Sequence, residues 1–393
     1  MAHQQSIREK VLANQVQFFG NKAFQATDFQ GNSPPSIFVS WKNYPNVTIA
    51  PMSLPQHVKD ADIFDNPERW LDLSTEDILT FRQSLIRGNT RVAVQDAAAP
   101  DKKLQTLQEL AMAKRPFDVD LALQKRPDTV LEFNRFNAPL GPQAPLKALE
   151  FRENPSVHRK VDYLVSDTQA KSTASLLELF EAGIPLHTLE KLLSAGLLGV
   201  QKERKLVPTR WSITAVDSTI SKHVVEEVRQ LQELGEVQLY HSSHFFNVFY
   251  VLLVPGHFAF EEMEAWQAQS NGQTVHQFSV DHEFFKGRTT YAKNTEGAYY
   301  AARLAVAEHL RSMKRQAQCI VFREISPEYT SLGVWSIREN VRDAFKGKPL
   351  LFNDISLALA YLGTRLSIPL QEWLKHSKLL DAIRNQKRIT DYF

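Results

Sequence analysis

The sequence predicts an α+β protein, with a mixed α/β arrangement as the alternative, folded as one large composite domain or as two closely packed domains. Three observations support this class. Short β-type runs punctuated by proline fill the first sixty residues, and strand-like and helical patterns alternate in the second half. The length of 393 residues also exceeds what one ordinary hydrophobic core accommodates.

Residues 1–145 are expected to form an N-terminal region with short strands and a few helices. Residues 36–39 and 47–49 are β-type runs flanked by prolines. Because proline cannot donate a hydrogen bond to a central ladder, these runs predict edge strands and turns.

Two helices are expected in the same region. Ser74 or Thr75 can cap the first helix, and Gly88 can end it. The apolar positions of residues 104–113 predict the second. The stretch NAPLGPQAP, residues 137–145, then indicates a loop or a boundary between two parts.

Residues 146–384 are expected to form the main α/β body. Gly183 and Gly196 are placed to end two short helices. A strand is considered at 211–216, followed by a helix over 221–235. Further strands are predicted at 236–240, 246–255 and 318–325, and further helices at 297–315, 335–345, 354–363 and 369–384.

Bulk properties exclude several classes of protein. The single cysteine, Cys319, allows no intramolecular disulfide and no cysteine-rich metal site, and its apolar surroundings predict a buried thiol. No apolar run is long enough for a membrane helix, so we expect a cytoplasmic protein with no membrane contact. The net charge of +2 permits nucleic-acid binding without arguing for it. No metal site is predicted, the cofactor is left open, and no standard catalytic motif is present.

The densest polar cluster spans residues 201–223. Its cationic side chains can contact phosphates, and Trp211 offers a stacking face. Asp217 could bind a metal or accept a proton. The alternative is a solvated basic loop that leads into a core strand. The phosphate-binding candidates of this cluster are Lys202, Arg204, Lys205 and Arg210.

Two other groups supply weaker candidates. Glu296 precedes Gly297 at an expected helix start. The free amides of such a start can bind an anion, but Glu296 can equally serve to complement the helix dipole. Arg303 follows on the same helix. Arg323 and Glu324 are neighbours on an expected strand and must therefore point to opposite faces. Together with Arg338 they form either internal ion pairs or a site for a phosphate-bearing ligand.

Several stretches together resemble the archaeal Nre DNA-repair family, and KLVPTRWSITAVD is the most specific among them. The resemblance implies a DNA-damage-response factor that works with the replication clamp PCNA. Members can begin with a cysteine-rich segment, which this chain lacks because its cysteine is at position 319. The stretches that carry the resemblance are residues 34–52, 81–88, 154–167, 192–217, 297–310 and 323–342.

The family also gives meaning to the final octapeptide QKRITDYF, residues 386–393. Gln386, Ile389, Tyr392 and Phe393 fit the PCNA-interacting pattern Gln-x-x-aliphatic-x-x-aromatic-aromatic. One helical turn would gather the three apolar side chains into a plug for a partner pocket. We expect this peptide to be a short flexible tail, exposed or poorly ordered without a partner.

The leading hypothesis is therefore a DNA-repair factor recruited to PCNA by residues 386–393, whose folded body contacts DNA or a nucleotide. Two alternatives stay open. One is an enzyme for a phosphate-bearing small ligand, with Arg210, Asp217, Glu296, Arg323 and Glu324 as the catalytic candidates. The other is a non-catalytic regulator of the clamp.

Overall fold

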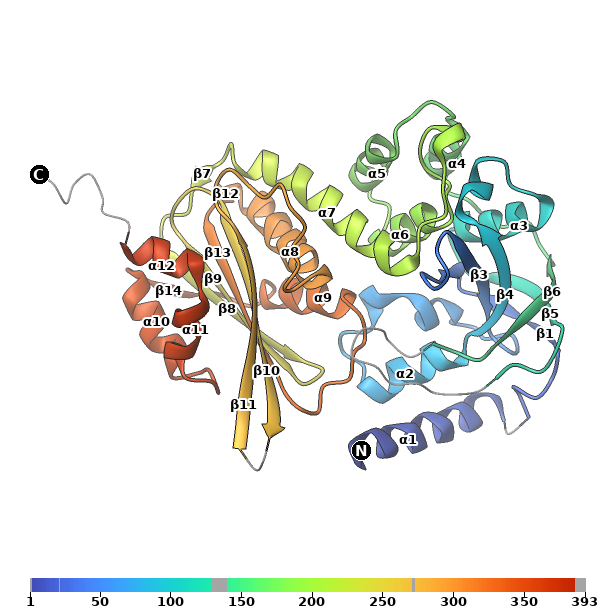
Figure 1. Cartoon of the computed structure of the whole chain (residues 1–393), viewed down its shortest axis with the longest axis horizontal. Coiled ribbons are helices and arrows are strands. Elements are labelled where there is room, and N and C mark those ends of the chain that lie inside the picture. Colours follow the sequence, from blue (N-terminus) through green and yellow to red (C-terminus); the bar gives the residue numbers. More distant parts are fainter. Residues whose placement is uncertain (1, 21, 129–139, 271–272, 386–393) are drawn as a thin grey trace, which may run out of the picture. The chain divides into compact units, whose positions relative to one another are not determined.

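The computed structural model describes residues 2–20, 22–128, 140–270 and 273–385 (Figure 1). The chain forms two compact units, which we call unit 1 (Met1–Ile220 with Thr330–Gly333) and unit 2 (Ser221–Tyr329 with Val334–Phe393). Each unit combines helices with a mostly antiparallel sheet, which confirms the α+β class. Residue 145, the expected end of the N-terminal region, lies within a strand of the unit 1 sheet.

A six-stranded sheet in the order β1-β5-β6-β4-β3-β2 forms the centre of unit 1. All neighbours pair antiparallel except β4 and β6. The prediction of an edge strand is confirmed for β2 and wrong for β3, whose ladder with β4 is interrupted at Ala50 and Pro51. The strands are β1 (Asp28–Ser33), β2 (Ser36–Val39), β3 (Asn46–Ser53), β4 (Ile86–Ala93), β5 (Phe117–Leu123) and β6 (Gln143–Phe151).

The other elements of unit 1 are helices and short 3-10 turns. Ser74 caps α2, because its hydroxyl oxygen accepts a hydrogen bond from the Asp77 amide, as predicted. The predicted stop is wrong, since α2 ends at Ser84 and Gly88 lies in β4. The helices are α1 (Ala2–Phe19), α2 (Thr75–Ser84), α3 (Lys102–Met112), α4 (Arg159–Ser166), α5 (Ser172–Glu181) and α6 (Leu186–Ser194), with 3-10 turns at Ala61–Asp65, Pro67–Arg69, Val94–Ala98 and Gln201–Glu203.

Helix α7 (Thr209–Val228) contains the boundary between the units, which falls after Ile220. Residues 211–216 are helical, so the strand considered there is wrong. The helix expected over 221–235 is present only as far as Val228, as the second half of α7, and residues 232–233 form a strand instead. The left-handed φ angles of Gly183 and Gly196, 75° and 66°, confirm the two predicted helix ends.

A second six-stranded sheet, in the order β11-β10-β13-β9-β8-β14, forms the centre of unit 2. Strands β10 and β13 pair in parallel, and the other neighbours pair antiparallel. A two-stranded sheet of β7 and β12 completes the unit. The strands are β7 (Gln232–Glu233), β8 (Val237–His244), β9 (Asn247–Val254), β10 (Ala259–Ser270), β11 (Gln273–Glu283), β12 (Arg315–Gln316), β13 (Gln318–Ile325) and β14 (Leu350–Phe352).

Helices cover both faces of the unit 2 sheet (Figure 1). Helices α8 and α9 pack on one face, and α10 to α12 bury the other against an apolar cluster that includes Met263, Phe322 and Trp373. The helix expected over 369–384 is interrupted at Ser377. Within the described residues no helix is both long and apolar enough to cross a bilayer. The helices are α8 (Gly297–Met313), α9 (Trp335–Ala344), α10 (Ile355–Gly363), α11 (Leu370–His376) and α12 (Lys378–Asn385).

Candidate functional site

The turn between β2 and β3 in unit 1 carries an unexpected group of exposed aromatic residues. Its backbone is fixed by internal hydrogen bonds: the Tyr44 amide donates to the Trp41 carbonyl (3.4 Å), and the Asn46 amide donates to the Asn43 carbonyl (2.8 Å). The Pro45 carbonyl also accepts a bond from the Val94 amide (2.9 Å). The turn is therefore stabilised by its own hydrogen bonds and by the amide of Val94, the residue that follows β4.

The start of α7 is attached to the same turn. The hydroxyl oxygen of Thr209, the first residue of α7, accepts a hydrogen bond from the Val39 amide at the end of β2 (2.9 Å). The Ser194 hydroxyl at the end of α6 donates to the Val207 carbonyl (2.7 Å). The bond between Val39 and Thr209 joins the 34–52 and 192–217 stretches, which are far apart in the sequence, and the Ser194 bond holds the second stretch together.

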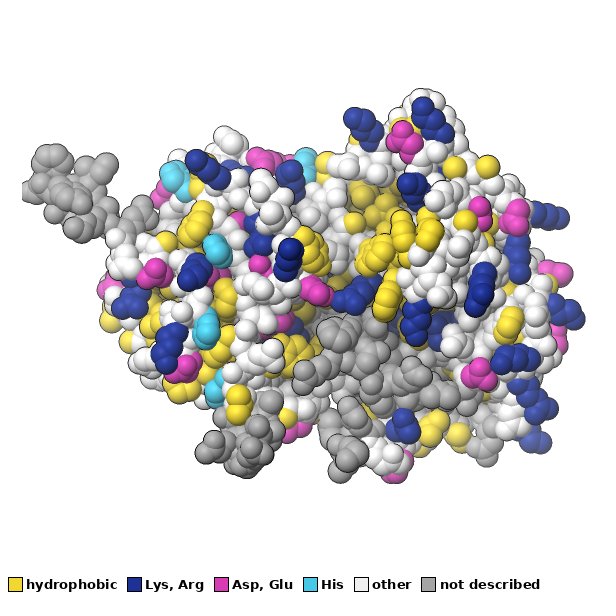
Figure 2. All heavy atoms as spheres, in the orientation of Figure 1, with side chains coloured by type: hydrophobic (Ala, Val, Ile, Leu, Met, Phe, Trp, Pro, Cys, Tyr) yellow, Lys and Arg dark blue, Asp and Glu magenta, His cyan; other side chains and the backbone are white. Residues whose placement is uncertain are grey.

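The result is a set of three exposed aromatic residues, Trp41, Tyr44 and Trp211, which we call the aromatic platform. The rings of Tyr44 and Trp211 lie 5.2 Å apart between centroids and are tilted by 54°. The three residues are 45%, 50% and 45% exposed, respectively. In Figure 2, hydrophobic side chains gather over α6 and the start of α7, with Lys and Arg side chains nearby.

The predicted basic residues of this segment fall into two groups. Lys202 and Lys205 are exposed, and Arg210 is half-buried. Arg204 is buried, and its guanidinium donates to the backbone carbonyls of Gly199, Val165 and Asp167 over 2.8–3.1 Å. Burial also lowers the pKa of Arg204. Arg204 therefore stabilises the loop from within, whereas the two lysines remain accessible to a phosphate.

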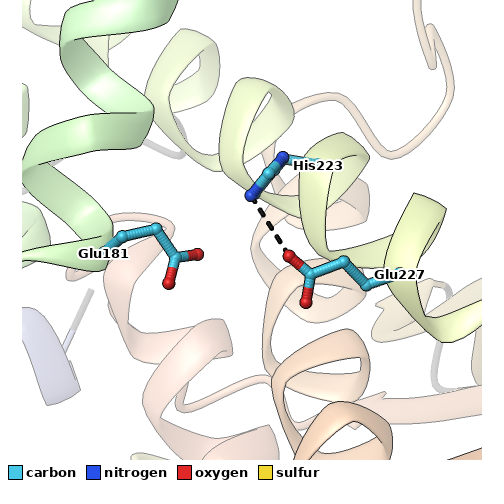
Figure 3. Close-up of side chains that lie close together, drawn as sticks. All are labelled: Glu181, His223 and Glu227. Carbon is cyan, nitrogen blue, oxygen red and sulfur yellow. Dashed lines mark ion pairs between the residues drawn. The ribbon is translucent and has the colours of Figure 1, made fainter.

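The rest of the 201–223 cluster lies along α7. Ser212 and Asp217 are fully buried, so neither side chain is presented to solvent. His223 and Glu227 are one turn apart and form an ion pair, with 3.3 Å between Nε2 and Oε1 (Figure 3). This spacing is the usual i, i+4 pairing on a helix surface.

In unit 2, Arg323 and Glu324 point to opposite faces of β13, as the strand geometry requires. Arg323 is buried, forms an ion pair with Glu264 of β10, and donates from Nε to the Asn247 amide oxygen (2.9 Å). The carboxylate of Glu324 accepts bonds from the amides of Ser367 (3.1 Å) and Ile368 (2.9 Å). Both candidates therefore have internal structural partners.

The remaining candidates of unit 2 are also internal. Arg303 of α8 is buried and forms an ion pair with Glu283 at 2.7 Å. Arg338 of α9 is almost fully buried, with Nε 3.5 Å from Glu339. Glu296 immediately precedes α8, which confirms the predicted helix start. Arg210 belongs to unit 1, whereas these residues belong to unit 2.

Glu262, which was not among the candidates from the sequence, is a buried carboxyl group close to the charges of Glu264 and Arg323. Glu262 of β10 is fully buried, and neither of its oxygens has a hydrogen-bond partner of normal geometry. Burial, and then the charge of Glu264, raises the pKa of Glu262 well above its usual value, an effect that Arg323 opposes only in part. Glu262 is therefore protonated over a wider pH range than an ordinary glutamate.

The proposed clamp motif, Gln386, Ile389, Tyr392 and Phe393, lies outside the described residues. The helix immediately before it is well anchored. Glu261 of β10 accepts hydrogen bonds from the Ser377 hydroxyl and from the amides of Lys378 (2.7 Å) and Leu379 (3.2 Å). A buried carboxylate of the sheet thus caps the start of α12.

Sequence reasoning identified Trp211 but missed Trp41 and Tyr44. The signal was available, because SWKNYP places two aromatic residues in a turn between two predicted strands, where no core is expected. Nothing local in the sequence indicates that this turn lies beside α7.

Two family models match the chain: "Archaeal Nre, N-terminal" over residues 7–271 and "Archaeal Nre, C-terminal" over residues 283–392. DNA repair protein NreB of Archaeoglobus fulgidus is 36% identical over 91% of this chain and 90% of its own length. The NreA proteins of Haloferax volcanii and A. fulgidus are 35% and 37% identical, over 82% and 87% of this chain and 80% and 85% of their own lengths. No solved structure matches the chain. Two models that together span most of the sequence, and relatives aligned over most of their length, establish that the chain belongs to the archaeal Nre family.

Proposed function

We propose that this chain is a DNA-repair factor that acts in the cytoplasm, is recruited to the PCNA sliding clamp by residues 386–393, and contacts DNA through unit 1. The repair role is supported by its relatives, three of which are named DNA repair proteins. The observation that carries recruitment is the match of QKRITDYF to the four fixed positions of the clamp-binding pattern.

The chemistry of the octapeptide suits a clamp pocket. Ile389, Tyr392 and Phe393 can bury apolar area, and each aromatic side chain contributes on the order of 150–250 Å². The Gln386 amide can donate and accept directional hydrogen bonds that fix the register. Lys387 and Arg388 favour association with an acidic rim.

The recruitment proposal is tested by calorimetric titration of purified clamp with the full-length chain. Replacing both Tyr392 and Phe393 by alanine is expected to weaken binding at least tenfold, because the two anchors of the plug are lost. A variant with residues 386–393 in scrambled order keeps the composition and charge and should also fail to bind. Unchanged affinity in either variant would rule out this motif as the clamp ligand.

The contact with DNA is supported by the exposed cations and aromatic rings of unit 1. The alternative of an enzyme for a phosphate-bearing ligand has less support, because two of its catalytic candidates are internal: Arg323 is buried in an ion pair with Glu264, and Asp217 is fully buried. A clamp regulator without DNA contact is distinguished by DNA-binding assays on the isolated full-length chain, where it would show no affinity.

A further inference from the structure

We propose that the aromatic platform binds unpaired bases of single-stranded DNA by stacking them on Tyr44 and Trp211, with the exposed Trp41 in the same turn as Tyr44. This assignment rests on the proposed repair function and adds the class of DNA that unit 1 takes. Bases in an intact duplex have both faces covered by their neighbours, so only unpaired bases can stack on a protein ring.

The exposure of the platform requires an explanation, because tryptophan and tyrosine gain more from burial than most residues do. Trp41, Tyr44 and Trp211 are each about half exposed, and two of them lie in contact with one another. Isolated exposed aromatic residues are ordinary, but Tyr44 and Trp211 come from distant segments and are in ring contact, which is typical of a patch that marks a binding site.

The platform is also held in place before any ligand arrives. Its two parts are joined by the bond from the Val39 amide to the Thr209 hydroxyl, and the turn is fixed by the bond from the Val94 amide to the Pro45 carbonyl. A preformed surface avoids the ordering cost that a flexible loop would incur on binding.

The two segments that carry the platform contain cationic residues, which suit a polyanion. Residues 36–52 contain one lysine, Lys42, and no acidic residue, and residues 204–216 contain two arginines, one lysine and no acidic residue. Lys42 lies between Trp41 and Tyr44 in the turn and is exposed, as is Lys205. Cations that flank stacking rings are the arrangement used for a strand whose phosphates and bases both face the protein.

The test measures binding of a fluorescently labelled 20-nucleotide oligothymidylate to the full-length chain by anisotropy. Trp211→Ala and Tyr44→Ala are each expected to weaken binding about 5- to 150-fold, the range for the loss of one base stack. Trp211→Phe should retain most of the affinity, because it keeps a stacking face. Tyr163→Ala is the matched control: Tyr163 is 60% exposed on α4 of the same unit, and its removal should leave binding unchanged.

Salt dependence gives a second readout that folding defects would not imitate. Lys42→Gln should reduce the slope of log affinity against log salt concentration by about 0.7, the value for one lost phosphate contact on a single strand. Circular dichroism identifies any variant that is simply unfolded.

Several results would overturn the assignment. One is a lack of oligothymidylate binding by the unaltered protein, and another is a loss of affinity in Tyr163→Ala as large as in Trp211→Ala. Equal affinity of the unaltered protein for a blunt 20-base-pair duplex, or tighter binding of the corresponding RNA, would also overturn it. Clamp titration and oligothymidylate titration of the unaltered protein separate the two proposals. Normal clamp binding without DNA binding would reject the platform alone, whereas DNA binding without clamp binding would reject recruitment alone.

Discussion

Glu262 of β10 lies directly across the ladder from Asp281 of β11, and both carboxyl groups are buried. Asp281 is satisfied by the amides of Asn294 (2.8 Å) and Thr295 (2.9 Å) and by an ion pair with Arg288 (3.0 Å). Glu262 has no comparable set of donors. Two adjacent buried carboxyl groups are tolerated because Asp281 is paired and the pKa of Glu262 is raised, which favours its protonated form.

Glu262→Gln should raise the free energy of unfolding at pH 7. The pKa of Glu262 is raised in the folded protein above its ordinary value of 4.5, so ionisation opposes folding. The native protein should therefore lose stability as the pH rises above about 4.5. The part of this loss that comes from Glu262 should be absent from the variant. Denaturant titrations from pH 4.5 to 8.5 measure it, with exposed Glu236→Gln as the control. A variant less stable than the native protein at pH 7 would contradict the assignment.

Arg323→Met should destabilise the protein by about 3–5 kcal/mol, because it leaves the Glu264 carboxylate buried without its cation. The double variant Arg323→Met with Glu264→Met should recover most of that loss, since apolar side chains of similar volume replace a buried ion pair at little cost. Urea unfolding of both single variants and the double variant gives the coupling free energy. If the losses simply add, the two side chains are not coupled in the folded state.

Glu261→Ala should loosen the C-terminal helices. The amides of Lys378 and Leu379 and the Ser377 hydroxyl lose their common acceptor, and each unsatisfied buried group costs about 1–3 kcal/mol. Hydrogen exchange should rise in α12 first. Glu372→Ala, which removes an exposed ion pair with Lys375, is the matched control and should leave exchange in α12 unaltered. Equal exchange in both variants would exclude Glu261 as the cap of α12.

His309 should make unit 2 sensitive to mild acid. Burial against Phe345, on whose ring it stacks at 3.8 Å, lowers the pKa of His309 to about 4. The folded state favours the neutral ring, so stability is complete above the ordinary value of 6.5 and is lost as the pH falls from 6.5 towards 4. The loss should stay below about 1.4 kcal/mol per pH unit, because a single imidazole takes up at most one proton.

The check is thermal unfolding of His309→Phe between pH 4 and 7. This variant keeps a ring on Phe345 and should show a flatter dependence on pH. The exposed His257→Phe should follow the native curve. A His309→Phe curve as steep as the native one would assign the acid sensitivity to other groups.

Much of the local structure could be predicted from the sequence, because the signals are local. Ser74 before α2, the glycines after α5 and α6, and the apolar run of β9 each specify an element through capping, φ angle or burial. Strand β10 was missed because its glutamates disguise a buried strand. Their partners, such as the amides at the start of α12, are more than a hundred residues away in the sequence.

The candidate site shows the same division. Trp211 could be found as an aromatic residue within a basic segment, but Tyr44 joins it only through the pairing of β2 and β3 and the bond from Val39 to Thr209.

Helix α1 is another element that the sequence did not predict. Ile7, Val11 and Phe19 are buried, but apolar residues of the same helix are exposed, so the sequence shows no clear apolar face. The exposed ones include Leu12, Val16 and Phe18.

Helix α12 ends at Asn385, and the proposed clamp motif begins at the next residue. In the proposed complex almost no linker would therefore separate the folded protein from the clamp. A short linker gives a high local concentration of the protein at the clamp and limits the distance that the protein can reach from it. Which lesions the bound protein could reach would then depend on the dimensions of its own folded units.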